Sequence, residues 1–362
     1  MRAVPLPFAA LILLLVLVGC GVTDALTPSD ALRSAQALPT GFAYPPNDTV
    51  RVATYNVENF IDAYDDPYVD NNRENEPDLD AVAEKGRLFA EAVRALDADV
   101  LSIQEIESEQ QLKLLADALF PEMGYQFFAS TESPNWYQNV VVMSRLPLGP
   151  LTSFADVWTP IEGQTNDDGT PASTSLVNHR LFAVEVRARP DYTFTLVAAH
   201  LKAGRGERNE GWRLGQINLL RGYLATLPPE TNVLLAGDLN FLAPSLEYTC
   251  ATTGTSGVRP ELLVEQPLLT SCSDGFGLHD PLRRNRGLPT FSPEDHTHPS
   301  DNPERRLDYL LLSWMELELI PGSMRTARPL SDADLARLSD HLPVVADFLA
   351  RDRRPGDPTP VR

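Results

Sequence analysis

The chain has 362 residues, of which 43% are hydrophobic, and its 50 acidic and 30 basic residues give a formal net charge of −20. This hydrophobic content excludes a wholly disordered chain, and the length is enough for one large domain with a full core. The acidic balance disfavours a protein that coats nucleic acid through a broad basic surface, because such binding needs clustered lysine and arginine. It leaves open an acidic enzyme that captures one phosphate at one site.

The N-terminal segment has the features of an export signal. Arg2 precedes an apolar run over residues 8–18 that ends at Gly19 and Cys20 and is short for a membrane span. The end of this run resembles a bacterial lipobox, which implies cleavage before Cys20 and acylation of that cysteine. We therefore expect residues 1–19 to be a signal peptide and the exported protein to be lipid-anchored to the bacterial cell envelope. A buried strand or helix is the alternative.

The remaining chain divides into a tether, one domain and a tail. Residues 20–47 are rich in Ala, Pro, Ser and Thr without a clear period, which is typical of a tether. Residues 351–362 contain three prolines and are expected to be disordered. Residues 48–350 form the predicted domain. Inside it, Cys250 and Cys272 are expected to form a disulfide, because an exported protein meets an oxidising compartment, with two free thiols as the alternative.

The hydrophobic pattern of the domain alternates between short strands and amphipathic helices. Strands are predicted at residues 50–57, 100–104, 140–144, 182–186, 194–200, 233–236, 307–312 and 343–348. Helices are predicted at residues 79–96, 110–119 and 212–227. Strand–helix–strand units are followed by several strands in succession and then by a second similar half. This order favours an α/β fold of two packed sheets with helices outside over a doubly wound sheet.

Polar side chains recur where the apolar strands end. They are Asn56 and Glu58, Glu105, His200, Asp238 and Asn240, Asp308, and the pair Asp340 and His341. Each alone is explained by the preference of Asp and Asn for turns. Six strand ends of this kind together indicate a site built at one edge of the sheets.

The residue types at these strand ends define a chemistry. Oxygen ligands without the spacing of Cys and His ligands select Mg²⁺, Mn²⁺ or Ca²⁺ over Zn²⁺. A histidine beside an aspartate can take a proton from water, since its pKa lies near neutrality. The sequence has no P-loop, no Gly-x-Ser-x-Gly motif and no dinucleotide fingerprint. Hydrolysis of a phosphoester by metal and histidine is the interpretation that remains.

Six ordered motifs carry a family resemblance. The strings TYNVEN, SIQEIE, AAHLKAG, LAGDLN, RRLDYLLLS and SDHLPV occur in this order between about residues 50 and 349. In this order they resemble the endonuclease/exonuclease/phosphatase (DNase I-like) superfamily, which includes nucleases, inositol polyphosphate phosphatases and bacterial sphingomyelinases. The resemblance implies a four-layer α/β sandwich of two mainly antiparallel sheets flanked by helices.

The resemblance also assigns roles to the strand-end residues. It implies that Glu105 is the principal metal-binding carboxylate, with Asn56 beside it, and that Glu58 and Asp340 also reach the metal. The implied catalytic and phosphate-binding residues are His341 with its orienting partner Asp308, His200 at the leaving group, Asp238 and Asn240 on the nucleophile or a phosphate oxygen, and Arg180 on the phosphate.

These roles predict a monomeric phosphoesterase that depends on Mg²⁺ or Mn²⁺, with Ca²⁺ as an alternative. Nucleic acid is the expected substrate. Two alternatives stay open: a phosphatase or phosphodiesterase that acts on phospholipid head groups or small phosphoesters, and a surface binding protein that keeps the fold without the activity.

Four further stretches of the sequence carry less specific signals. Residues 200–215 carry a local surplus of basic residues that could orient a phosphate substrate or be an ordinary solvated face. Residues 62–80 are strongly acidic and are expected to be a solvated insertion rather than a Ca²⁺ site. His296 and His298 are expected to be simply exposed on a Pro-rich loop. Trp136 and Tyr137 could equally line a cleft or pack in the core.

Overall fold

The computed structural model describes residues 29–33, 35–62, 79–133, 136–228, 230–243, 245–252, 278–283, 292–354 and 356–358. Cys20, Cys272 and most of the acidic stretch 62–80 lie outside these residues, so the lipidation, the disulfide and the nature of that stretch stay predictions. Among the described helices, none is long and apolar enough to cross a membrane.

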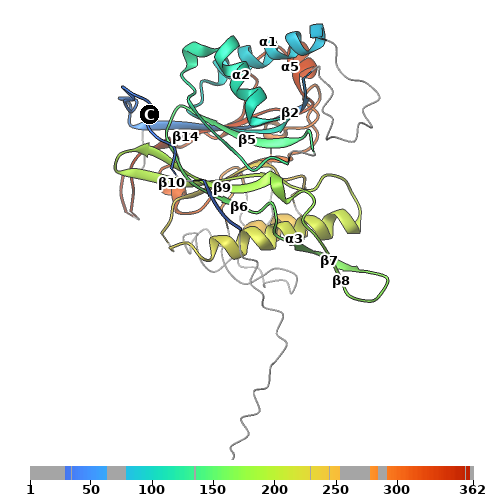
Figure 1. Cartoon of the computed structure of the whole chain (residues 1–362). Helices are drawn as coiled ribbons and strands as arrows, with labels where there is room; N and C mark the ends of the chain where they lie inside the picture. Colours follow the sequence, from blue (N-terminus) through green and yellow to red (C-terminus); the bar gives the residue numbers. More distant parts are fainter. Residues whose placement is uncertain are drawn as a thin grey trace, which may run out of the picture.

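Two six-stranded sheets pack face to face (Figure 1). The first has the order β1 (Ser29–Arg33), β6 (Leu148–Ser153), β9 (Leu181–Arg189), β10 (Tyr192–His200), β11 (Val233–Asp238) and β12 (Asp308–Leu312). The second has the order β13 (Arg325–Thr326), β14 (Val344–Leu349), β2 (Thr49–Phe60), β3 (Val100–Ile106), β5 (Asn139–Ser144) and β4 (Phe127–Ser130). A large apolar cluster with Val52, Val142, Leu196 and Leu310 fills the space between them.

Within each sheet, one parallel strand pair interrupts an otherwise antiparallel arrangement. β2 pairs with β3 in parallel, and β10 pairs with β11 in parallel. A helix makes the crossover in both cases, as parallel strands require. All eight predicted strands are present, and the predicted sandwich of two mainly antiparallel sheets is confirmed.

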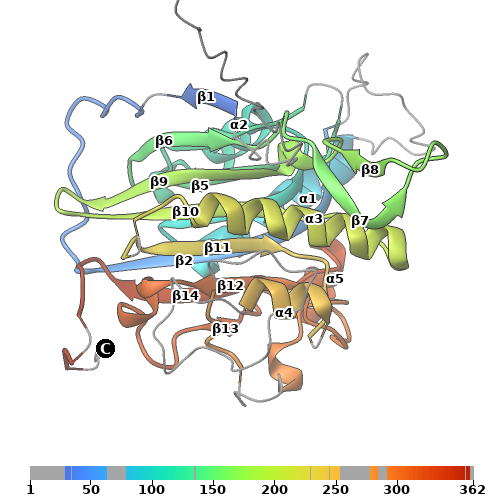
Figure 2. The ribbon, with the colours of Figure 1, turned by 90° about the horizontal axis from the view of Figure 1, so that it is seen from below.

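Helices cover the two outer faces and complete the four layers (Figure 1). α1 (Leu79–Leu96), α2 (Glu109–Leu119) and α5 (Asp332–Leu338) lie over the second sheet, and α3 (Glu207–Leu224) and α4 (Leu246–Thr252) lie over the first sheet, as Figure 2 also shows for the latter two. α1 has the predicted bounds and buries only one face. The side chain of Ser108 caps α2 by accepting a hydrogen bond from the backbone N–H of Gln111.

The helix α3 differs from α1 because it is covered on both sides. Every residue from 211 to 217 is buried. The hairpin of β7 (Thr159–Thr165) and β8 (Pro171–Thr174) packs on the face of α3 that points away from the sheet (Figure 2). Gly211 and Gly215 make this possible, since a Cβ at either position would overlap a carbonyl oxygen of β7. The helix begins five residues before the predicted start, because its first turn is polar and gives no apolar signal.

Ordered structure extends beyond the predicted domain limits at both ends. β1 pairs with β6 within the expected tether, and Phe42 packs edge-on against Phe127, with ring centroids 5.6 Å apart. In the expected tail, the backbone N–H of Arg353 donates to Glu318 Oε1 at 2.9 Å.

Candidate active site

The predicted site residues converge at the carboxyl ends of the two parallel strand pairs. In the first sheet, His200 is in register with Asp238, and Asp238 is in turn opposite Asp308 on β12. In the second sheet, Asn56 and Glu105 lie near the carboxyl ends of β2 and β3. β14 is antiparallel to β2, so the residues before it, Asp340 and His341, return to the same edge. Strand topology therefore assembles the site from residues that are far apart in the sequence.

Asn56 connects the two sheets. Its Nδ2 donates to Glu105 Oε1 and to Asp238 Oδ2, both at 3.1 Å. Its Oδ1 accepts the backbone N–H of Glu58 at 2.9 Å. The predicted residue is thus in the site, but it presents its amide N–H groups to the carboxylates while its oxygen is engaged by the backbone.

Glu105 is held in place by three donors. Besides Asn56, the backbone N–H of Asn59 and Nε2 of Gln138 donate to Glu105 Oε2 at 3.1 and 3.0 Å. Its backbone has a left-handed φ of 60°, a conformation that costs free energy for a residue with a Cβ. This strain and the donors fix the carboxylate at the pocket rather than along the strand. Neither Asn59 nor Gln138 was singled out from the sequence.

His341 and Asp308 form a buried dyad. His341 Nδ1 and Asp308 Oδ2 are 2.7 Å apart. An ionised carboxylate only accepts, so Nδ1 carries the proton and Nε2 faces the pocket. Burial lowers the pKa of His341, but the charges of Asp308 and Asp238 outweigh it and raise this pKa to about 10. The predicted orienting role of Asp308 matches this geometry.

Asp238 and His200 are buried side by side. Burial raises the pKa of Asp238 to about 7, with His341 opposing the rise and Asp308 adding to it. Burial also lowers the pKa of His200 well below its usual range, so its imidazole is neutral near pH 7. His200 Nε2 lies 3.7 Å from both Glu105 Oε1 and Asp238 Oδ2, which is too long for a hydrogen bond. Neither ring nitrogen of His200 has a hydrogen-bond partner among the described residues.

Glu58 and Asp340 lie together beside the dyad. Asp340 Oδ1 is 3.8 Å from His341 Nε2, and the backbone N–H of Asp340 donates to Glu58 Oε2 at 2.9 Å. Burial and the charge of Asp340 raise the pKa of Glu58. Burial also acts to raise the pKa of Asp340, but the hydrogen bond from His298 and the charge of His341 lower it overall.

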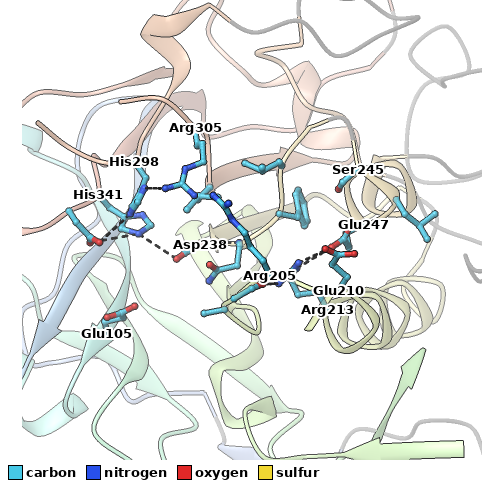
Figure 3. Close-up of a pocket in the computed structure, with 18 residues that line it drawn as sticks. Glu105, Arg205, Glu210, Arg213, Asp238, Ser245, Glu247, His298, Arg305 and His341 are labelled. Atoms are coloured by element: carbon cyan, nitrogen blue, oxygen red, sulfur yellow. Dashed lines mark hydrogen bonds and ion pairs between the residues drawn. The ribbon is translucent and has the colours of Figure 1, made fainter. Parts of the chain in front are cut away.

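The expectation for His298 is wrong. The ring is largely buried, with 19% of the side chain exposed, and its centroid lies 4.9 Å from that of His341. Its Nε2 lies 3.2 Å from Asp340 Oδ2, and its Nδ1 lies 3.3 Å from Nη2 of Arg305 (Figure 3). The loop turns back on itself, so that the backbones of His298 and Arg305 pair, and this return could not be read from a Pro-rich stretch. His296 is half-buried, with Nδ1 3.3 Å from the carbonyl oxygen of Pro303.

Arg180 lies close to Glu105. It is buried, its Nη2 donates to Gln138 Oε1 at 3.1 Å, and burial lowers its pKa to about 10 against the opposing charge of Glu105. Its guanidinium carbon is 5.6 Å from the ring centroid of Trp136, which is 41% exposed and stacks on Tyr137. The aromatic pair therefore borders the site instead of packing in the core.

A pocket of about 810 Å³ opens at these residues. Glu105, Asp238, Asn240, Asp340 and His341 all line it. The side-chain Nδ2 of Asn240 donates to the carbonyl oxygen of Leu201 at 3.2 Å, and its backbone N–H donates to Asp238 Oδ1 at 2.9 Å. Its left-handed φ of 51° turns the chain out of β11 into the pocket wall.

The donor set fits a hard divalent cation. Glu105, Asp238 and Asp340 bring carboxylate oxygens to one pocket, and burial together with the charge of neighbouring carboxylates raises the pKa of Glu58 and of Asp238. Mg²⁺ and Mn²⁺ favour such ligands. Glu105 and Asp340 are the residues best placed to hold the ion. His298, Asp340 and His341 also lie close enough to share one.

Comparisons with known proteins agree with this geometry. Residues 53–341 match the Endonuclease/Exonuclease/phosphatase family. No curated protein matches the chain. D. rerio TDP2 complexed with a single-strand DNA product has a TM-score of 0.52 at 14% identity, over 83% of this chain and 99% of that chain. The human Nocturnin catalytic domain with bound sulfate has a TM-score of 0.51 at 18% identity, over 83% of this chain and 94% of that chain.

ANGEL2, a 2',3'-cyclic phosphatase, has a TM-score of 0.50 at 14% identity, over 84% of this chain and 96% of that chain. These three likenesses concern the fold, whereas the family match spans the domain and contains every strand-end residue of the site. The chain belongs to the Endonuclease/Exonuclease/phosphatase family and is a phosphoester-hydrolysing enzyme.

Proposed function

We propose that the protein is a divalent-metal-dependent nuclease that hydrolyses phosphodiester bonds of nucleic acid outside the cell. The observation that carries this proposal is the Asp308–His341 dyad, which faces Asp238 across the pocket lined by Glu105. A general base for the attacking water and a cluster of carboxylates suited to a cation therefore lie in the same pocket.

Each residue of the site has a separate role in the proposed reaction. His341 Nε2 would accept the proton of the attacking water once a bound divalent ion offsets the carboxylate charges that raise the pKa of His341 to about 10. Asp308 holds the imidazole in the required tautomer and stabilises its charged form. Asp238 and Asn240 orient the water or a phosphate oxygen, and His200 supports the departing oxygen. A bound divalent ion would supply charge stabilisation for the phosphoryl group and the leaving oxygen.

Two points support nucleic acid as the substrate. TDP2, which shares the fold, is known with a single-strand DNA product. In addition, exposed Trp136 borders the site beside Arg180 and offers a surface on which a base could stack. The complete catalytic set argues against a protein that keeps the fold only for binding. The export and lipid anchoring through Cys20 complete the proposal, and replacing Cys20 by Ser should release the protein from membranes.

A substrate panel tests the proposal. The exported chain, which begins at Cys20, is incubated with single-stranded DNA, RNA, sphingomyelin, inositol phosphates and bis-p-nitrophenyl phosphate, each with Mg²⁺, Mn²⁺ or Ca²⁺ and with EDTA. We expect cleavage of nucleic acid with Mg²⁺ or Mn²⁺ and no cleavage in EDTA. Turnover of lipid without turnover of nucleic acid would transfer the proposal to the phospholipid class, and full activity in EDTA would contradict the metal dependence.

A further inference from the structure

The pocket extends well beyond the catalytic residues. From His341 it continues between the loop that follows β10, the N-terminal end of α3, α4 and the residues just before β12 (Figure 3). Three arginines line this extension: Arg205, Arg213 and Arg305. They outnumber the two carboxylates there, Glu210 and Glu247, whereas the catalytic end of the pocket is rich in carboxylates.

Arg213 and Arg306, which lie on the same two chain segments as Arg205 and Arg305, have a structural role. Arg213 is buried and donates to Glu247 Oε1 through Nη2 at 3.0 Å, and its Nη1 donates to the carbonyl oxygens of Lys202 and Gly204 at 2.9 and 2.7 Å. Arg306 is buried, 2.8 Å from Asp280. These inward-facing arginines fix the two segments from which Arg205 and Arg305 are presented.

The outward-facing arginines have no carboxylate partner among the described residues. Arg205 is exposed, and the loop that carries it is held by Nδ2 of Asn209, which donates to the Arg205 carbonyl oxygen at 3.1 Å. Arg305 is half-buried, and its Nη2 lies 3.3 Å from His298 Nδ1. One exposed carboxylate, Glu210, shares the pocket extension. In an acidic protein, two arginines left without ion pairs in one pocket indicate an anionic ligand.

His298 aligns Arg305 with the catalytic end. Arginine can only donate, so His298 Nδ1 accepts from Arg305 and Nε2 carries the proton that is donated to Asp340. With Nε2 committed as a donor, His298 is a positioning residue instead of a metal ligand. Arg305 is therefore one imidazole ring away from Asp340 and His341, which is close enough for one substrate to contact both ends.

Apolar side chains occupy the wall between the two arginines and α4. Leu242 is 44% exposed and Leu246 is 38% exposed, and both line the same extension. Exposed leucines beside a charged subsite offer contact to the flat, weakly polar faces of a sugar and base. A substrate with a single phosphate and no chain would use neither these leucines nor the arginines.

We propose that Arg205 and Arg305 bind the phosphate next to the scissile one in a polynucleotide, with Leu242 and Leu246 against the intervening nucleoside. This inference rests on the proposed nuclease function and sharpens it. The enzyme recognises a chain of at least two consecutive phosphates, which separates it from an enzyme that acts on a single phosphodiester group.

The test compares substrates that differ by one phosphate. Thymidine dinucleotide TpT has one cleavable diester and no second phosphate, whereas pTpT and TpTp add a phosphate on one side or the other. We expect the wild-type enzyme to have a higher kcat/KM on one of these two than on TpT. Arg205→Ala and Arg305→Ala should each reduce that advantage by about tenfold, the value of a charge-assisted hydrogen bond. The loss of kcat/KM should be larger on the substrate with two phosphates than on TpT and bis-p-nitrophenyl phosphate.

Matched variants separate charge from structure. Arg325→Ala removes an exposed arginine on β13, outside the pocket, and should change neither ratio. Arg305→Lys should keep part of the higher kcat/KM on the substrate with two phosphates. In single-stranded DNA, the salt dependence of log kcat/KM should weaken by about 0.7 for each lost phosphate contact. Arg205 is exposed, so its alanine variant is expected to fold even if the Arg305 variant does not.

Three results would overturn the subsite. They are an equal kcat/KM of the wild type on TpT, pTpT and TpTp, an equal loss on one-phosphate and two-phosphate substrates, and no loss in either arginine variant. If the wild type cleaves no nucleotide but turns over a lipid or another phosphoester, the proposed function fails and the subsite fails with it. Cleavage of TpT without any arginine dependence rejects the subsite alone.

Discussion

The two strand–helix–strand units of this protein, β2–α1–β3 and β10–α3–β11, have the same topology but contribute different chemistry. The first carries Asn56 and Glu105 near the carboxyl ends of its strands, and the second ends in His200 and Asp238. Asn56, His200 and Asp238 are buried, whereas Glu105 is partly exposed. We expect this arrangement of parallel strands to supply the main metal-binding carboxylate from one sheet and groups that contact the phosphate from the other.

The helices of the two units also differ in burial, and the more buried helix again belongs to the second unit. α1 is exposed along one face, with Arg87 between Glu84 and Glu91 on it, whereas α3 is buried on both sides by the sheet and by β7–β8. The unit that holds buried titratable groups is also the one that is covered by a further layer. We infer that exclusion of water from the second unit is part of what keeps His200 neutral and raises the pKa of Asp238.

The largest expected effect tests the proton-handling side. His341→Ala should lower kcat by about 10²- to 10⁴-fold, because the general base is lost. The affinity for Mn²⁺, measured by calorimetry, should change little, because Glu105 and Asp340 are the residues best placed to hold the cation. A fall in kcat of less than tenfold would remove His341 from proton transfer.

The second prediction tests the cation-binding side. Glu105→Gln should weaken Mg²⁺ or Mn²⁺ binding by at least about 10- to 100-fold, the effect seen even for outer partners of metal ligands. The metal concentration at half-maximal activity and the calorimetric dissociation constant both report it. If Glu105→Gln leaves these unchanged while His341→Ala shifts them, the assignment of Glu105 to the cation and of His341 to proton transfer is wrong.

The third prediction concerns the packing of β7 against α3. Gly215→Ala should lower the free energy of unfolding by about 1–3 kcal/mol, because the new Cβ overlaps the carbonyl oxygen of Pro160. The matched control is Gly222→Ala on the same helix, where nothing lies within 4 Å of an added Cβ. That change should be neutral or stabilising by up to about 1 kcal/mol. Urea unfolding measures both, and equal effects would show that β7 does not hold α3.

The fourth prediction is a pKa measured in metal-free protein. Asp308 and Asp238 raise the pKa of His341 to about 10 against the effect of burial. Asp308→Asn removes one of these charges, so this pKa should fall by more than one unit toward the ordinary histidine value of about 6.5. Titration of the imidazole signals by NMR measures it. An unchanged midpoint would mean that the dyad is not formed in solution.

The smallest expected effect lies on the exposed face of α1. Arg87→Ala removes ion pairs to Glu84 and Glu91 whose side chains are all substantially exposed. Ion pairs between exposed side chains contribute little to stability, so the unfolding midpoint should barely move. A loss comparable to that of Gly215→Ala would erase the contrast between the two helices.

Much of the fold and site was predictable because each strand is an apolar run that stops at a polar residue. Asn56, Glu105, His200, Asp238, Asp308 and His341 were found in this way or through their motifs, and they all meet in the structure. The strands of the β7–β8 hairpin were not predicted, because they cover a helix with polar sequence and lack the alternation of a half-buried strand.

His298 and Gln138 could not be found from sequence for a different reason. Both lie outside the motifs, in segments whose path is set by distant contacts, His298 by its backbone pairing with Arg305 and Gln138 by its hydrogen bond to Glu105. Periodicity reports which residues share a face, but it does not report where an irregular loop returns. The functional residues that the sequence did not predict are therefore those positioned by loops.

The bridging amide of Asn56 has a consequence for how activity is acquired during folding. Its Nδ2 reaches a carboxylate of each sheet, so the catalytic constellation exists only at the correct distance between the sheets. A chain in which one sheet has formed but has not docked on the other holds half of a site and is inactive. Recovery of hydrolysis on refolding therefore measures the rate at which the two sheets dock, and an enzyme of this design cannot hydrolyse its substrate before its tertiary structure is complete.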